Sequence, residues 1–284
     1  MGNPVFGRAD VFQPRHPQQS ANHGSPAGEW GTSQQPYLQG QGMAGAAALG
    51  RPGNLDQPRQ ATMTLDDVIA KTGVVLLVLA AAAALTFSFV GTNLATAGTI
   101  TVVTSLVSFV TVLIVSARRR VPAGGVMAYA LVEGVFIGAF SAVFEAMYPG
   151  IVVQAALGTF AAAGVTLAVY KFTGFRVTSR FRRIVTIATF GFAGAMLLNL
   201  ILALCGINLG IRDSGGAVSG IAIIASIVGV VLAASSLIMD FDSVRVGIDN
   251  HAPTSESWRA AFGIAVTMVW LYTEILRILS YFRE

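Results

Sequence analysis

Seven long apolar stretches constrain this chain more than any other feature of its sequence. A helix needs about 20 consecutive, mostly apolar residues to cross the hydrocarbon core of a bilayer. Windows of that length lie at residues 72–90, 97–116, 124–146, 150–172, 184–205, 217–239 and 260–281. Turn-forming clusters such as Gly91-Thr92-Asn93 and Tyr148-Pro149-Gly150 separate neighbouring windows. The pattern predicts an all-α membrane protein, a bundle of seven transmembrane helices that contacts the lipid bilayer.

The composition excludes a soluble globular domain for most of the chain. Hydrophobic residues make up 54% of it and charged residues only 11%, whereas soluble domains carry about 25% charged residues. The single cysteine excludes a framework of disulfide bonds. The net charge of +4 is interpreted as a membrane-topology signal rather than as a nucleic-acid-binding surface, so no nucleic-acid partner is expected.

Residues 1–64 differ from the rest of the chain. They contain seven of the ten prolines and nine of the ten glutamines, and they lack hydrophobic periodicity. Such a segment cannot bury enough apolar area to offset the entropy lost on ordering. We therefore expect a disordered, Pro/Gly/Gln-rich cytoplasmic tail at residues 1–64 and a transmembrane domain at residues 65–284. Thr64, which precedes Asp66 and Asp67, predicts the start of the first helix.

The distribution of Lys and Arg predicts the orientation of the bundle. Ten basic residues fall in or beside the second, fourth and sixth loops, against one, Arg212, in the other three. Short loops rich in Lys and Arg stay on the cytoplasmic side of a membrane. The N-terminus is therefore expected in the cytoplasm, and the C-terminus at Glu284 on the opposite side of the cell membrane.

Small residues at fixed spacing predict close contacts between helices. Gly134 and Gly138 form one GxxxG motif, Gly216 and Gly220 form a second, and residues 191–195 carry a small-xxx-small face. Helices in lipid associate through such small residues, which let their backbones approach. We expect these three helices to lie inside the bundle.

Ionisable residues at membrane depth are the candidate functional residues. An acid inside a span is costly to bury, so it usually faces the bundle or a water-filled cavity and marks a function. The candidates are Glu133 in the third span, Asp240 and Asp242 at the end of the sixth, and Glu274 and Arg277 in the seventh.

Each candidate also has a structural interpretation. Glu274 and Arg277 are three residues apart and are suited to forming a private ion pair. Asp240 and Asp242 point about 200° apart on a helix, so only one of them can face the core of the bundle. Glu133 is also suited to a packing hydrogen bond, for example with Asn199 of the fifth span.

Five segments carry a resemblance to a known family. They are residues 64–69 (TLDDVI), 129–138 (YALVEGVFIG), 240–243 (DFDS), 260–263 (AAFG) and 270–277 (WLYTEILR). Together they resemble the bacterial branch of the Bax inhibitor-1 family, also called Bax inhibitor-1/YccA or TMBIM. The resemblance covers residues 62–283 and omits the tail. It implies a seven-helix fold in the bacterial inner membrane, with the last helix in the centre and the other six around it.

The resemblance also implies a function. Members of this family are described as pH-sensitive calcium leak channels, whose sensor is a pair of aspartates on the sixth and seventh helices. Matching the motifs places Asp242 and Glu274 in these two roles. This chain has Glu in place of the second aspartate, and its sixth loop is longer. A shifted register instead aligns Arg277 with a later arginine and places Thr267 at the position of the second acid.

The predicted mechanism is a proton-controlled cation pathway along the seventh helix. A proton shared by Asp242 and Glu274 would hold helices six and seven together, and its loss would leave two anions that accept a cation. Carboxylate oxygens suit Ca²⁺, and Glu133 is a further pore-lining candidate. We expect no cofactor and no certain metal site, with Ca²⁺ only as the permeant ion.

The alternatives to a cation pathway fall into two other classes of function. The first is a non-conducting regulator that binds a membrane-bound protease, as some relatives of this fold are thought to do. The second is an enzyme, which we do not expect. The chain lacks the motifs G-x-x-x-x-G-K-[ST], H-E-x-x-H and G-x-S-x-G, and it lacks the paired motifs of intramembrane aspartyl proteases.

Overall fold

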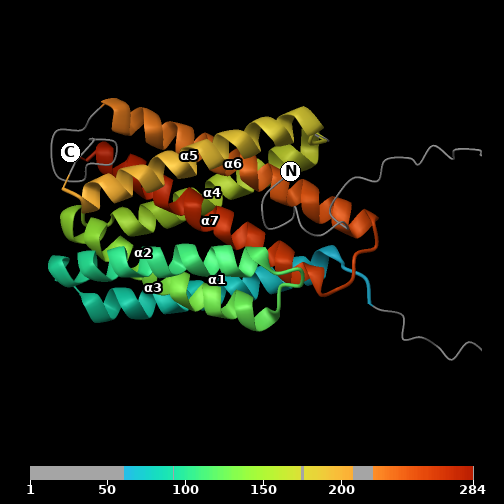
Figure 1. Ribbon diagram of the computed structural model, residues 1–284, viewed down its shortest axis with the longest axis horizontal. Coiled ribbons are helices and arrows are strands. Elements are labelled where there is room, and N and C mark those ends of the chain that lie inside the picture. Colours follow the sequence, from blue (N-terminus) through green and yellow to red (C-terminus); the bar gives the residue numbers. More distant parts are fainter. Residues whose placement is uncertain (1–60, 92, 174–175, 207–219, 284) are drawn as a thin grey trace, which may run out of the picture. The chain divides into compact units, whose positions relative to one another are not determined.

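The computed structural model of the chain describes residues 61–91, 93–173, 176–206 and 220–283. This part of the chain forms seven α-helices, each long and apolar enough to cross a membrane (Figure 1). They are α1 (Leu65–Val90), α2 (Leu94–Ala117), α3 (Ala123–Met147), α4 (Ile151–Thr173), α5 (Ser179–Leu204), α6 (Gly220–Asp249) and α7 (Glu256–Tyr281). The predicted seven-helix membrane fold is confirmed.

The outer face of the bundle is apolar. Large hydrophobic side chains stand exposed on α1, α2, α4, α5 and α6, among them Leu85, Val110, Leu157, Ile187 and Ile224. Such a surface is stable against hydrocarbon and not against water. The chain is therefore a multi-pass membrane protein whose outer face contacts the bilayer.

The predicted tail divides into two parts. Residues 1–60 lie outside the described residues. Residues 61–64 are structured, and we call them the N-terminal strap. Within the strap the Met63 side chain is only 2% exposed, and its N–H donates to the Ala252 carbonyl oxygen at 2.7 Å. Apolar burial and backbone pairing with the α6–α7 loop hold these residues, which the sequence analysis assigned to the tail.

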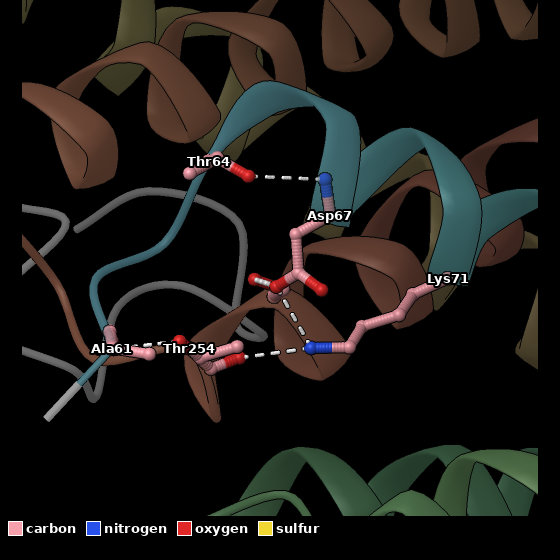
Figure 2. Close-up of polar contacts among 6 residues, drawn as sticks. Ala61, Thr64, Asp67, Lys71 and Thr254 are labelled. Carbon is pink, nitrogen blue, oxygen red and sulfur yellow. Dashed lines mark hydrogen bonds and ion pairs between the residues drawn. The ribbon is translucent and has the colours of Figure 1, made fainter.

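Figure 2 shows how the strap and the start of α1 hold the α6–α7 loop. Thr64 caps α1 by accepting a hydrogen bond from the Asp67 N–H at 3.2 Å, as predicted for the start of this helix. The Thr254 N–H donates to the Ala61 carbonyl oxygen at 2.9 Å. Lys71 Nζ donates to Asp67 Oδ2 at 2.8 Å and to the Thr254 carbonyl oxygen at 3.1 Å. These bonds fix the chain just before α7 begins.

α7 is the central helix, as the resemblance implies. It packs against α1, α3, α4 and α6, while α2 packs on α3 and α5 packs on α6. Most of its length is buried, from Glu256 to Ser280. Near its start the Phe262 ring meets Tyr129 of α3 edge-on, with 4.9 Å between ring centroids. Charged and polar side chains on α7 are therefore held inside protein rather than in lipid.

The predicted close helix contact is found for the first GxxxG motif. A methyl group on Gly134 would lie 2.5 Å from the Ala82 Cβ of α1, and one on Gly138 would meet the Ala83 carbonyl oxygen. These glycines let the α1 and α3 backbones approach. The α5 prediction is wrong, because a methyl group on Gly191 or Gly194 would meet nothing within 4 Å. The motif at residues 216–220 lies mostly outside the described residues.

The sixth helix is longer than its apolar window predicts. The window ended at residue 239, whereas α6 runs to Asp249. Val244 and Gly247 stay buried on one face, so the helix continues to pack although its mean hydropathy falls. Asp240 and Asp242 therefore lie within α6 and not at its end, which corrects the predicted position of both acids.

Candidate functional site

Asp240 lies on the interface between α6 and α7. Its side chain is fully buried, and Oδ2 accepts a hydrogen bond from the Thr267 hydroxyl of α7 at 2.6 Å. Asp240 is nine residues from the end of α6, or about 14 Å at the usual helical rise. A carboxyl group at this depth, held across two helices, is the arrangement expected of a functional intramembrane acid.

Asp242 faces the opposite way, as the predicted angle of about 200° requires. Its Oδ2 lies 2.9 Å from Arg182 Nη2 of α5, and its Oδ1 accepts a weak hydrogen bond from the Tyr170 hydroxyl of α4 at 3.4 Å. Both members of the ion pair are largely buried. Asp242 therefore connects α6 to α4 and α5, and Asp240 alone faces α7.

Glu274 lies deeper along the same α6–α7 interface. It is 1% exposed, and a methyl group on Gly229 of α6 would lie 2.7 Å from its Cδ. Gly229 and Asp242 are 13 residues apart on α6, or about 20 Å along the helix axis. The predicted pairing of Asp242 with Glu274 is therefore wrong, since antiparallel helices place these two residues at different heights.

Thr267, which the shifted register placed at the position of the second acid, donates its hydroxyl hydrogen bond to Asp240. It does not meet Asp242, which the resemblance placed in the first role and which pairs with Arg182 instead. The functional roles of Asp240, Asp242 and Glu274 stay predictions.

Small residues connect the two buried acids of this interface. On the buried face of α6 they recur every three or four positions and lead to Asp240: Ala222, Ser226, Gly229, Ala233 and Ser236. Residues at that spacing share one face of a helix. We call this face, with Glu274, Asp240 and Thr267, the α6–α7 seam. It places two carboxyl groups along one line of small side chains, about 10–17 Å apart in height by the rise along α7 from Thr267 to Glu274 and along α6 from Gly229 to Asp240.

Glu133 is buried, but its partner is not the predicted one. Ser108 of α2 donates a hydrogen bond to Glu133 Oε2, so the acid connects α2 to α3. Asn199 lies on α5, and α3 packs against α1, α2, α4 and α7. The geometry favours the structural interpretation of Glu133 as a packing partner.

Two arginines of α7 take different positions. Arg277 Cζ lies 5.9 Å from the centre of the Phe140 ring of α3, a cation–π contact. Arg259 is fully buried, bonded to Glu256 at 2.8 Å and to the Arg118 and Arg119 carbonyl oxygens at the end of α2. Arg259 is one of the ten basic residues that are predicted to lie in or beside the cytoplasmic loops. Glu256, three residues before it, is the signal that could have identified an ion pair.

The part of the chain that the structure describes contains no cluster of three or more His, Cys, Asp or Glu side chains. At Asp240 a cation would meet the carboxyl group and the Thr267 hydroxyl, both of which are oxygen ligands of the kind that Ca²⁺ takes.

The model of one protein family, described as Bax inhibitor 1 like, matches residues 3–284. The match thus also spans most of the N-terminal segment, which the resemblance omitted. No curated protein matches the chain.

Proposed function

Because the chain belongs to the Bax inhibitor 1 like family, we propose that it provides a pH-sensitive leak pathway for Ca²⁺ or similar cations along the α6–α7 seam. The proposal depends above all on one observation. Asp240 is fully buried between α6 and α7 and is held there by Thr267. A carboxyl group is rarely kept at this depth without a function.

The seam supports the proposal through its chemistry. Glu274 and Asp240 give two carboxyl groups at different heights, and Ser226 and Ser236 add hydroxyl oxygens on the buried face of α6. Hard cations such as Ca²⁺ prefer such oxygen ligands. The side chains between the two acids are small and occupy little volume. A cation and its water would therefore displace few protein atoms as they pass.

Asp240 supplies the pH sensitivity in this proposal. Thr267 faces it from α7, and the nearest acid on α6, Asp242, is held by Arg182 and faces α4 and α5. A proton on Asp240 removes the charge that attracts a cation. Flux should therefore increase with pH as that proton is lost.

The alternative is a non-conducting regulator of a membrane-bound protease. Exposed basic side chains favour it: Arg118, Arg119, Arg120, Arg180 and Arg183 lie beside the α2–α3 and α4–α5 loops. The loops at this end of the bundle are those predicted to face the cytoplasm, as is the N-terminus. A basic surface of this kind suits an acidic partner without any ion flux.

The test uses the purified full chain in liposomes that contain a trapped calcium indicator. The leak proposal predicts Ca²⁺ entry that exceeds entry into protein-free liposomes and increases with pH. No entry above that control at any pH would contradict the leak proposal. Co-purification of a membrane protease with a non-conducting chain would then support the regulator.

A further inference from the structure

A cleft of about 490 Å³ lies between α1, α3, α4 and α7, away from the α6–α7 seam. Buried side chains form its floor, among them Ile137 of α3 and Met268 and Val269 of α7. Exposed side chains form its walls, Ala80 and Ala84 on α1 and Val153 and Phe160 on α4. The cleft therefore opens sideways between α1 and α4, toward the hydrocarbon of the bilayer.

The few polar groups in the cleft already have partners in the protein. The Ser141 and Tyr272 hydroxyls are 2.7 Å apart, and the Thr159 hydroxyl donates to the Ala155 carbonyl oxygen at 2.7 Å. The two Glu145 carboxylate oxygens accept from the Gly150 and Val152 N–H groups at the start of α4. Since each of these groups already has a hydrogen-bond partner in the protein, the cleft suits an apolar occupant.

The length of the cleft, and the position of its polar groups toward the α3–α4 loop, indicate which kind of molecule fits it. Along α1 it runs from Leu76 to Phe87, or about 16 Å by helical rise, which matches one leaflet of a hydrocarbon core about 30 Å thick. Ser141, Glu145 and Tyr272 lie toward the α3–α4 loop. An extended chain that enters from that side would have its apolar end at Met268.

We propose that this cleft binds one acyl chain of a phospholipid from the leaflet at the α3–α4 loop, with the lipid head group at that loop. Each methylene group that moves from fluid hydrocarbon into the cleft contacts the side chains of its walls and floor. Bound there, the chain fills the space between α1 and α4 over the α7 floor. Met268 follows Thr267 directly, so the occupant packs against the same turn of α7 that holds Asp240.

The test reconstitutes the full chain into phosphatidylcholine vesicles that contain a phosphatidylcholine with a photoreactive diazirine on one acyl chain. After illumination, peptide mass spectrometry locates the adducts. A label at the chain end should mark the peptide with Met268, and a label near the glycerol ester should mark the peptide with Ser141 and Glu145. Equal labelling of outward side chains such as Leu85 and Leu157, or the reverse order of depths, would overturn the proposal.

Matched variants distinguish lipid binding in the cleft from lipid contact with the rest of the outer surface. Ala80→Phe and Ala156→Phe each place a ring in the cleft, whereas Ala81→Phe and Ala161→Phe place the same ring on α1 and α4 outside it. In the first two variants the ring takes the place of the acyl chain beside Met268, so most of the labelling of Met268 should be lost. The other two should label as the wild type does. Equal labelling of Met268 in all four folded variants would also overturn the proposal, and the wild-type depth test does not depend on any variant folding.

Discussion

A methyl group on Gly229 would lie 2.7 Å from the Glu274 carboxyl carbon, so a missing side chain on α6 makes room for the buried acid of α7. Glu274 is 1% exposed and cannot swing out into open space. The position of the acid and the identity of the glycine are therefore coupled. This relationship sets the height at which Glu274 meets α6 and separates it from Asp242.

Gly229→Ala should destabilise the bundle by about 1–3 kcal/mol, the usual effect of inserting a methyl group into a packed interior. Reversible unfolding in detergent measures the change. Gly191→Ala on α5 is the control, since a methyl group there meets nothing within 4 Å. Adding Glu274→Asp, which shortens the acid, should recover part of the loss. A Gly229→Ala variant as stable as Gly191→Ala would contradict the packing described.

Arg182 and Asp242 should show an energetic coupling of about 1–3 kcal/mol in a double-mutant cycle, because each is the partner of the other in a largely buried ion pair. Arg182→Met and Asp242→Asn supply the cycle, with unfolding free energy as the readout. The neighbouring Arg183 is exposed, so Arg183→Met should be additive with Asp242→Asn. Equal coupling for the two arginines would show that the pair is not specific.

Lys71→Met should loosen the N-terminal strap. The Lys71 ammonium group holds Asp67 and the Thr254 carbonyl oxygen, and hydrogen bonds to a charged group contribute about 1.5–3 kcal/mol each. Hydrogen exchange at the Met63 and Thr254 amides should increase roughly tenfold or more, because both amides donate to backbone carbonyls across the strap. Lys171→Met, an exposed lysine of α4, serves as the control. Unchanged exchange at both amides would mean that the strap is held by Met63 burial alone.

The sequence predicts the number of helices well because apolar length is a strong physical requirement for spanning a bilayer. It predicts the start of α1 through Thr64, whose capping role depends only on local geometry. It misses the end of α6, because residues 240–249 remain helical through packing on one face rather than through their mean hydropathy.

The partners of the buried acids were harder to predict. The family resemblance implied that Asp242 would meet another acid, but the register of two antiparallel helices decides which residues face each other. That register depends on the end of α6 and the length of the loop before α7. Thr267 carries no charge and gives no signal of its own, and its partner is Asp240 rather than Asp242, the acid to which the resemblance gave the sensor role.

The small residues of α3 and α5 show the same limit. Gly134 and Gly138 are matched by Ala82 and Ala83 on α1, whereas Gly191 and Gly194 have no close neighbour among the described residues. A small residue permits close approach, and only a complementary surface produces it. The sequence of one helix does not contain that second surface.

We propose that Asp240 controls cation flux along the α6–α7 seam, and Ca²⁺ flux into liposomes, measured as a function of pH, reports on that control. Asp240→Asn keeps the shape of the side chain and removes its charge, while Asp242→Asn changes an acid two residues away that faces α4 and α5. Loss of a charged ligand worth about 1.5–3 kcal/mol should lower flux by roughly ten- to a hundredfold. We expect this loss, together with a flat pH profile, for Asp240→Asn, whereas Asp242→Asn should keep a pH-dependent flux. A wild-type pH profile in Asp240→Asn would contradict it.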